Sequence, residues 1–303
     1  MIILFHSKDK KVIFLYTLLV NPVSGNGRSL KVLPEIEKVM REFKLPYHIE
    51  HTKCPGDAER ITRKAVSENE EGVVVVGGDG TVFESLSGII GSALTLIYAP
   101  SGTGNDFVKC MGLPVKNAAA AVKKQLSAFK RKLDYGLING IPFMNICGTG
   151  FDVEVLRKLG QYRARFRGLK AYLFALKDAL REYKPLECEI SVDGGPFIRK
   201  VLCILSVGNG QYFGGGMKAV PAGVPYDGEL NLVEVNAVKK WQIPFLLPLF
   251  ISGSHTKLHL TRTHRCKRVC VRAKDMTFQM DGELRNMQEA DIQVVPSGLN
   301  ARY

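Results

Sequence analysis

The chain has 303 residues, of which 46% are hydrophobic and 23% are charged, and this balance excludes a disordered protein and favours one or two globular domains. The formal net charge of +13 predicts an anionic partner, which leaves nucleotide, nucleic acid or an acidic membrane open. The seven cysteines are odd in number and form no C-x-x-C pair, so we expect a reducing compartment and a cytoplasmic protein.

The first part of the chain alternates apolar strands with amphipathic helices. Strands are predicted at residues 17–20, 47–51, 73–76 and 94–98. The last two are continuous apolar runs, which is typical of parallel strands that are covered on both faces. The apolar run before residue 17 has a charged start but no cleavage site, so we interpret it as part of a buried strand and not as a signal peptide. The pattern predicts a layered α/β domain.

From about residue 133 the pattern changes to short alternating segments. Turn signals such as Asn139-Gly140 and Asp193-Gly194 separate these segments and predict a mostly antiparallel β domain. Two helical stretches, near 168–183 and 240–252, interrupt it. Because no linker is visible, we expect two domains packed around a cleft. Their predicted bounds are 1–132 and 133–295, with the tail 296–303 completing the first domain.

Three glycine-rich loops follow predicted strands of the first domain. They read NPVSGNG at 21–27, GGDGT at 77–81 and PSGTGND at 100–106. Glycine lets a ligand approach the backbone closely, and amides before a helix bind anions. Each loop by itself is more often a plain turn, and none completes a Walker A or G-x-G-x-x-G motif. Together, at the carboxyl ends of parallel strands, they predict a phosphate site.

These loops, in this order and spacing, resemble the diacylglycerol kinase catalytic domain of the soluble bacterial lipid kinases, and more distantly sphingosine kinases and NAD kinases. The resemblance continues through NICGTGFDVEV, GNGQYFGGGMKAVPAGVPYDGELNLVEV and the late MDGE, so it covers nearly the whole chain. GGDGT alone is shared with NAD kinases, whereas the GTGNDF and DGELNLVEV segments point to lipid kinases. The resemblance implies a Rossmann-like α/β nucleotide-binding domain, a mostly antiparallel β-sandwich domain and an active site in the cleft between them.

The resemblance implies that the loops bind ATP. Matched by motif, the ATP-binding residues are Asn21, Pro22, Ser24, Gly25, Thr52, Gly77, Gly78, Asp79, Gly80, Thr81, Glu84, Gly102, Thr103, Asn105 and Asp106. Among them Asp79 would face the phosphates and Mg²⁺ and would act in catalysis. Phe83 stands where asparagine is usual in the family, which removes one polar contact of that pattern.

The general base of the family falls on Glu283, in Asp281-Gly282-Glu283, with Asp281 and Asp134 as further catalytic candidates. A carboxylate suits this role because phosphoryl transfer needs positioning, Mg²⁺ and an acceptor for the hydroxyl proton. The residues alone favour an ordinary Asp-Gly turn here.

The resemblance also places a second, structural Mg²⁺ in the segment AVPAGVPYDGELNL. Its ligands would be the side chain of Asp227 and the backbone carbonyls of Val224 and Glu229, with Asp134 connecting this metal to the active site through water. Oxygen ligands suit Mg²⁺. Another Asp-Gly turn without a metal is the alternative.

Two basic runs, 156–170 and 255–274, lie on either side of the apolar segment 241–253. A solvated face is the ordinary interpretation of such runs, but an anionic leaflet would attract each nearby cation by ~1 kcal/mol. The apolar segment is too short for the ~20 residues of a spanning helix. It would dip into the interface, line an acyl-chain channel or lie in the core.

We therefore expect a kinase that transfers the γ-phosphate of ATP to a lipid hydroxyl, with diacylglycerol, giving phosphatidic acid, as the favoured acceptor. Phosphatidylglycerol, monoacylglycerol and sphingoid or ceramide lipids are alternative acceptors. An NAD kinase is less favoured, because its further sequence signals are missing and its sugar acceptor does not explain the cationic and apolar helical region. A nucleic-acid-binding protein is less favoured, because few aromatic residues lie among the basic runs. The expected partners are ATP, Mg²⁺ and a lipid at the inner face of the membrane, without nucleic acid. A homodimer is left open.

Overall fold

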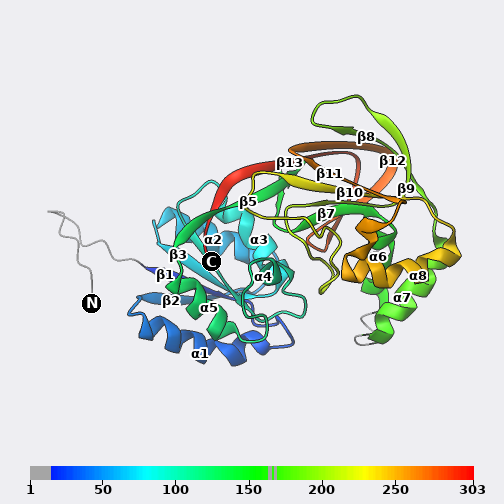
Figure 1. Cartoon of the computed structure of the whole chain (residues 1–303). Helices are drawn as coiled ribbons and strands as arrows, with labels where there is room; N and C mark the ends of the chain where they lie inside the picture. The colour runs from blue at the N-terminus through cyan, green and yellow to red at the C-terminus, as the bar shows by residue number, and fades with distance from the viewer. Residues whose placement is uncertain (1–14, 163–165, 167–168) are drawn as a thin grey trace.

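The computed structural model describes residues 15–162, 166 and 169–303, arranged in two lobes (Figure 1). The strand expected before residue 15 lies outside these residues. The first lobe contains β1 (Tyr16–Val20), α1 (Arg28–Glu42), β2 (Tyr47–His51), α2 (Asp57–Ser67), β3 (Gly72–Gly77), α3 (Asp79–Ile89), β4 (Thr95–Pro100), α4 (Asp106–Cys110) and α5 (Ala118–Ser127).

The strands of the first lobe form a parallel sheet in the order β2-β1-β3-β4. Val74 and Val76 of β3 pack with α1 and α5, whereas Val73 and Val75 pack with α2 and α3 on the opposite face. Both faces of β3 are therefore buried, which explains why its sequence is continuously apolar. The α/β part of the predicted fold class is confirmed.

The second lobe is mostly antiparallel, as predicted. It contains β5 (Lys130–Ile138), β6 (Ile141–Phe143), β7 (Ile146–Gly150), α6 (Phe151–Tyr162), α7 (Leu169–Glu182), β8 (Leu186–Val192), β9 (Ile198–Gly208), β10 (Leu230–Asn236), η1 (Lys240–Gln242), α8 (Ile243–Ser252), η2 (Ser254–Lys257), β11 (Thr261–Cys266), β12 (Arg268–Met280) and β13 (Glu283–Arg302).

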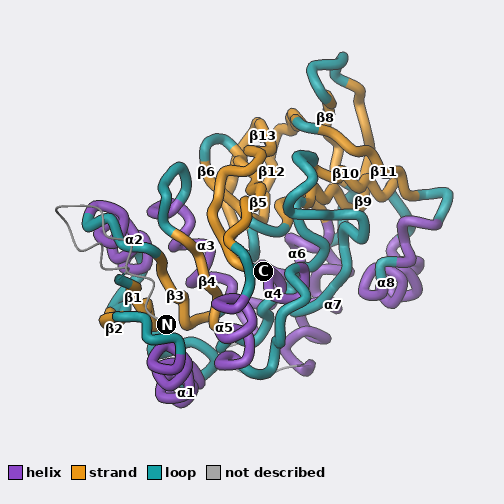
Figure 2. The backbone as a smooth tube through the Cα atoms, turned by 60° about the vertical axis from the view of Figure 1, so that its left-hand side comes forward, coloured by secondary structure: helices purple, strands orange, loops and turns teal. Residues whose placement is uncertain are grey.

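The two predicted helical stretches correspond to α7 and to η1 with α8. Helix α6 was not predicted, because its first residues, Phe-Asp-Val-Glu-Val, alternate between apolar and acidic as a strand does. Figure 2 shows α6, α7 and α8 on the second lobe, away from α1 and α2.

The last strand, β13, belongs to both lobes. Its early residues pair with β12 in the second lobe, and Asn300 and Ala301 pair in parallel with Thr95 and Leu96 of β4. Figure 1 shows β13, in red, running from one lobe into the other. A bulge near Ser297, which has a positive φ of 53°, interrupts its pairing with β5 where it crosses. The thirteen strands of the described residues consequently form one hydrogen-bonded sheet.

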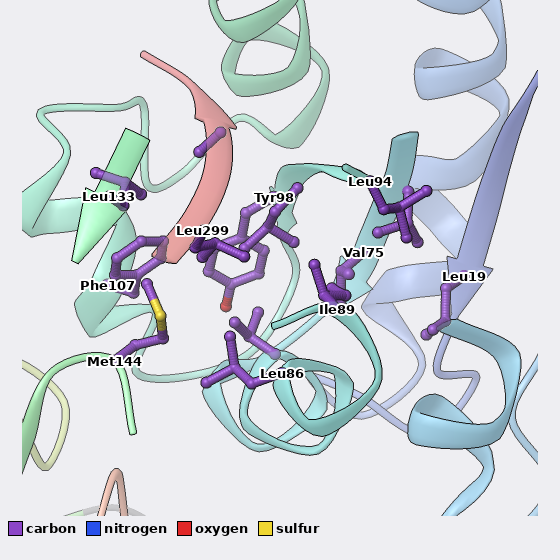
Figure 3. Packing of buried hydrophobic residues seen from close by; sticks show 14 of the residues in the cluster. Leu19, Val75, Leu86, Ile89, Leu94, Tyr98, Phe107, Leu133, Met144 and Leu299 are labelled. Atoms are coloured by element: carbon purple, nitrogen blue, oxygen red, sulfur yellow. The ribbon is translucent and has the colours of Figure 1, made fainter. Parts of the chain in front are cut away.

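The end of β13 contributes to the core of the first lobe, where Figure 3 shows Leu299 beside Phe107 and Tyr98. Leu299→Ala should lower the free energy of unfolding by about 2–5 kcal/mol, because it leaves a cavity in this core. Urea denaturation measures the change. Gln293→Ala, at an exposed position of the same strand, is the control and should stay within about 0.5 kcal/mol of the wild type. Equal effects of the two substitutions would contradict this role of the strand.

Candidate active site

A cleft of about 930 Å³ lies between the lobes, and residues of both lobes line it. Most of the residues predicted from sequence line this cleft: Asn21, Pro22, Ser24, Gly25, Thr52, Gly78, Asp79, Gly80, Thr81, Glu84, Gly102, Thr103, Asp106, Asp281 and Glu283. Within the described residues, the lining does not include Gly77, Asn105, Asp134, Val224, Asp227 or Glu229.

The glycine loops pack backbone against backbone. A Cβ on Gly25, which has a φ of 58°, would lie 2.0 Å from the carbonyl oxygen of Ser101. A Cβ on Gly102 would lie 2.5 Å from the Cα of Gly78. Side chains at these positions would force the loops apart, so the glycines are required for the loops to form one continuous surface of backbone groups.

The side chains of two asparagines form hydrogen bonds that hold these loops in place. The Asn105 side chain is buried; its Oδ1 accepts hydrogen bonds from the Gly102 amide and the Tyr98 hydroxyl, both at 3.1 Å. Asn21 donates from Nδ2 to the Thr81 hydroxyl at 2.9 Å, which joins the first loop to the second. We interpret Asn105 as a positioning residue beneath the site and not as a contact of the ligand.

Two neighbouring residues of α3, Phe83 and Glu84, contact the second lobe and helix α2. Glu84 accepts a hydrogen bond from the backbone amide of Ala58 at 3.0 Å, near the start of α2. Phe83, which replaces the usual asparagine of the family, packs against the hydrophobic core of the second lobe. Phe83 therefore provides an apolar contact between the lobes.

Acidic side chains from both lobes meet at the cleft. Asp79, the first residue of α3, accepts a hydrogen bond from the Asp106 amide at 2.8 Å. Asp106 forms an ion pair with Lys109 at 2.7 Å and accepts from the amide of Gly215, in the second lobe, at 2.8 Å. Burial, followed by the negative charges of Asp106 and Asp281, raises the pKa of Asp79 to about 6. A bound cation would relieve this repulsion.

Asp281 is held by three backbone amides. Its carboxylate accepts hydrogen bonds from Met144 at 2.6 Å, Asn145 at 2.9 Å and Ile146 at 3.0 Å. Burial raises the pKa of Asp281 to about 6, although these amides act in the opposite direction. The amides orient both carboxylate oxygens, so this side chain fixes the turn between β12 and β13 to the start of β7.

Glu283 follows this turn as the first residue of β13, and its exposed side chain lines the cleft. Asp281 and Gly282 have φ angles of 48° and 100°, as expected for the central residues of a tight hairpin turn. Both interpretations of this Asp-Gly-Glu segment are therefore compatible: it is an ordinary hairpin turn, and it places a carboxylate opposite the glycine loops.

The donor set of the cleft fits Mg²⁺ when a nucleotide is present. Within the described ranges, no three His, Cys, Asp or Glu side chains are arranged to hold a metal by themselves. Mg²⁺ in phosphoryl-transfer sites usually takes one or two carboxylates and completes its shell with phosphate oxygens and water. Asp79, which lies in the second glycine loop and whose pKa is raised partly by neighbouring negative charges, is suited to supply such a carboxylate.

Asp134 and the turn expected to bind a second metal lie outside the cleft. Asp134 accepts hydrogen bonds from the amides of Gly228 and Ser297, both at 2.7 Å, and so joins this turn to the bulge in β13. Asp227 and Glu229 both form ion pairs with Arg265. A Mg²⁺ ion here would have to displace this guanidinium from Asp227. The second metal site therefore stays a prediction.

Sequence reasoning missed several residues that line the cleft. They include Asn145, Tyr212, Gly214, Gly215 and Lys53. Gly214 and Gly215 adopt positive φ angles of 63° and 92°. The sequence feature that could have identified Gly214 and Gly215 is the run of three glycines at 214–216. Such a run is unusual outside a tight loop or a site of close backbone approach.

The fold and the cleft define a phosphotransferase: glycine loops at the carboxyl ends of parallel strands face a carboxylate-bearing turn from a second lobe. Two family models match the chain. The "Diacylglycerol kinase catalytic domain" matches residues 16–138, and the "YegS C-terminal NAD kinase beta sandwich-like domain" matches residues 145–302. The chain belongs to this diacylglycerol kinase and YegS family, and it is a lipid kinase.

Related proteins align over nearly their full length. A diacylglycerol kinase of Mycobacterium tuberculosis is 29% identical over 292 residues, covering 93% of each chain. A diacylglycerol kinase of Bacillus subtilis is 27% identical and covers 89% of this chain and 90% of its own. A solved structure described as a diacylglycerol kinase from Bacillus anthracis has a TM-score of 0.74 at 24% identity, covers 97% of this chain and 98% of its own, and supports the fold.

Asp79→Asn tests the assignment of the second glycine loop. We expect turnover with ATP to fall by at least ~10²-fold, since removing one electrostatic contact to the transition state has this effect. The fold should persist, because the asparagine oxygen still accepts the Asp106 amide. Initial rates and the melting temperature measure the two outcomes. Asp275→Asn, at an exposed position on β12, is the matched control. Normal turnover in Asp79→Asn would exclude this loop as the phosphate site.

Proposed function

We propose that this lipid kinase transfers the γ-phosphate of ATP to the free hydroxyl of diacylglycerol and forms phosphatidic acid, with Mg²⁺ in the cleft. The observation that carries the proposal is the meeting of three glycine loops with Glu283 across one cleft. Family membership supports a lipid hydroxyl as the acceptor. The names of relatives from M. tuberculosis and B. subtilis support diacylglycerol.

In this mechanism the backbone amides of the glycine loops bind the phosphates of ATP, because unpaired N–H groups before a helix attract anions. Asp79, at the start of α3, would hold Mg²⁺, which neutralises phosphate charge when it is bound. Glu283 accepts the proton of the acceptor hydroxyl as the new O–P bond forms. The bond between the γ-phosphorus and the bridging oxygen breaks, and ADP leaves.

Glu283 is favoured over the other candidate acids because of their contacts. Both oxygens of Asp281 accept backbone amides, so this side chain acts as a positioning residue for the turn. Asp134 is also occupied on both oxygens and lies outside the cleft. Glu283, by contrast, extends an exposed carboxylate into it.

Glu283→Gln should lower turnover by ~10²- to 10⁴-fold, the typical loss on removing a general base. The dissociation constant for ATP should hardly change, because the phosphate loops belong to the other lobe. Steady-state rates measure turnover, and equilibrium nucleotide binding measures the dissociation constant for ATP. Glu289→Gln, also exposed on β13 but not part of the cleft lining, is the control. Near-normal turnover in Glu283→Gln would place the base elsewhere.

We propose that the second lobe approaches the membrane with α7 and α8. No helix in the described part of the chain is long and apolar enough to span a bilayer. The outer surface of these helices and of η1 nevertheless exposes five large apolar side chains: Leu173, Phe174, Trp241, Phe245 and Ile251. Trp241 is 65% exposed and Phe245 is 73% exposed. Such a surface suits the interface of a bilayer.

Several of the positive charges in the basic runs are paired with acidic side chains, which the sequence alone does not show. In the basic run 255–274, Arg265, Arg268 and Arg272 form ion pairs with acidic side chains of the same lobe. Attraction to an anionic leaflet would then depend on other cations close to α8, such as Lys239 and Lys240. We propose a peripheral position at the inner face of the membrane on this basis.

Binding to phospholipid vesicles should increase with the fraction of anionic lipid and weaken with salt, because screening shortens the reach of surface charge. The double substitution of Trp241 and Phe245 by alanine should weaken binding at every salt concentration. Phe129→Ala removes an aromatic side chain that is 84% exposed on the first lobe, and it serves as the control. Unchanged sedimentation of the double variant with vesicles would contradict this membrane face.

Monoacylglycerol, phosphatidylglycerol and sphingoid or ceramide lipids remain alternative acceptors. Each carries a free hydroxyl that can accept the γ-phosphate. Transfer of labelled γ-phosphate to each lipid in mixed micelles decides the substrate. The homodimer that the sequence leaves open is a separate question, which the mass measured by light scattering would decide.

A further inference from the structure

A second, apolar cavity of about 90 Å³ lies in the second lobe beside the cleft. Its lining includes Val155, Leu159, Ile204, Leu246, Leu247 and Phe250. Leu156 and Gly214 line both this cavity and the cleft, so the two are adjacent. A lipid whose hydroxyl lies in the cleft is thus next to an apolar space for part of an acyl chain.

One carboxylate, that of Asp152, lines this otherwise apolar cavity. Asp152 is 7% exposed, and neither of its carboxylate oxygens has a hydrogen-bond partner in the described part of the chain. A buried polar group without a partner costs about 1–3 kcal/mol, and a charged one costs more. Such a group requires an explanation, and a missing ligand is one.

Asp152 also lies close to the cleft. It is the second residue of α6, and Leu156, which borders both cavities, lies four residues later on the same face of the helix. Four residues correspond to about 6 Å along the helix axis. The carboxyl group is therefore about one helical turn from the boundary where the polar part of a lipid acceptor would pass.

The surroundings of Asp152 favour its neutral form. Burial raises the pKa of Asp152 to about 7, although the amides of residues 152 and 153 at the start of α6 act against it. The titratable groups that face it are Tyr172 from α7, Cys203 from β9 and His255 from η2. Burial raises the pKa of the Tyr172 hydroxyl and raises that of Cys203 to about 11.

The histidine of the cavity does not neutralise Asp152. The ring nitrogens of His255 lie 3.1 Å from the carbonyl oxygen of Ala219 and 3.4 Å from that of Leu249. Burial lowers the pKa of His255, so the ring is neutral near pH 7. Among the residues that the structure describes, the lining of the cavity thus gives Asp152 no positive charge to hold it ionised, and its carboxylic acid form has an O–H to donate.

We propose that Asp152 is a specificity-determining residue for the lipid acceptor, and that its carboxylic acid donates a hydrogen bond to an ester carbonyl of an acylglycerol. This inference rests on the proposed function. Diacylglycerol suits the position because its only polar groups besides the reacting hydroxyl are ester groups, which accept hydrogen bonds. A sphingoid ammonium would instead require an ionised carboxylate at this position.

The test compares dioctanoylglycerol with its dioctyl ether analogue, which lacks the carbonyls. In the wild type, kcat/KM should favour the ester by about 3- to 10-fold, the size expected for one hydrogen bond. Asp152→Asn should keep most of this preference, because its amide still donates. Asp152→Leu should abolish it. The control Glu154→Gln removes a partly exposed carboxylate, paired with Arg157, from the same turn of α6 and should behave as the wild type.

The preference should also depend on pH. Below pH 7 Asp152 carries its proton and the ester is favoured, and above pH 7 the preference should decline as the O–H is lost. Titration of groups at the nucleotide site affects both lipids equally, so the ratio of their kcat/KM values does not depend on it. A preference that persists in Asp152→Leu would overturn the proposal. A preference for sphingoid bases that Asp152→Asn abolishes would also overturn it, in favour of an ionised carboxylate.

A binding measurement separates this inference from the proposed function. If the wild type phosphorylates no acylglycerol, the proposed function fails, but the shift in melting temperature with the ester or the ether, without ATP, still tests Asp152. An ester-specific shift that Asp152→Leu removes supports the inference, and equal shifts in the wild type contradict it. Without lipid, Asp152→Leu should melt a few degrees higher at pH 7, because the unpartnered acid disfavours the folded state increasingly from about pH 4 to 7.

Discussion

The arrangement of the site depends on the hydrogen bonds of one strand. β13 begins at the cleft with Glu283, pairs with β12 and β5 in the second lobe, and ends beside β4 in the first lobe. The two lobes are therefore joined by a sheet and not by a flexible linker. The register of this sheet sets how far the acidic turn stands from the glycine loops, and the contact of Asp134 with Ser297 maintains the bulge where the strand crosses.

The site is also held in place by its charges. Asp106 and Asp281 would repel each other and Asp79, but each is bound by backbone amides or by a lysine that fix its direction. Such fixed dipoles do not have to reorganise when a phosphate and a cation enter. Asp152 differs, since neither of its carboxylate oxygens has a hydrogen-bond partner of good geometry in the described residues, and only the amides at the start of its own helix act on it. The aspartates of the cleft thus have hydrogen-bond partners without a lipid, whereas the carboxylate of Asp152 does not.

Sequence reasoning succeeded where local backbone chemistry determines the structure. The parallel strands, the glycine loops and the Asp-Gly turns were predicted because burial on two faces and positive φ angles restrict the residues that fit. Helix α6 was missed because Phe151 to Val155 alternate as a strand does, and packing in the second lobe overrides that pattern. Contacts such as Gly215 with Asp106, or Arg265 with Asp227, could not be predicted because they join segments distant in the chain.

The shared strand has a consequence for synthesis in the cell. β4 is complete after residue 100, but the strand that covers its open edge ends near residue 302. At 5–20 residues per second, a ribosome needs about 10–40 seconds to make the intervening segment. During this interval a strand that is fully buried in the finished fold presents unpaired amides and carbonyls, which is the kind of surface that other chains can join. The edge of β4 therefore stays open to pairing with other chains until the end of this chain emerges.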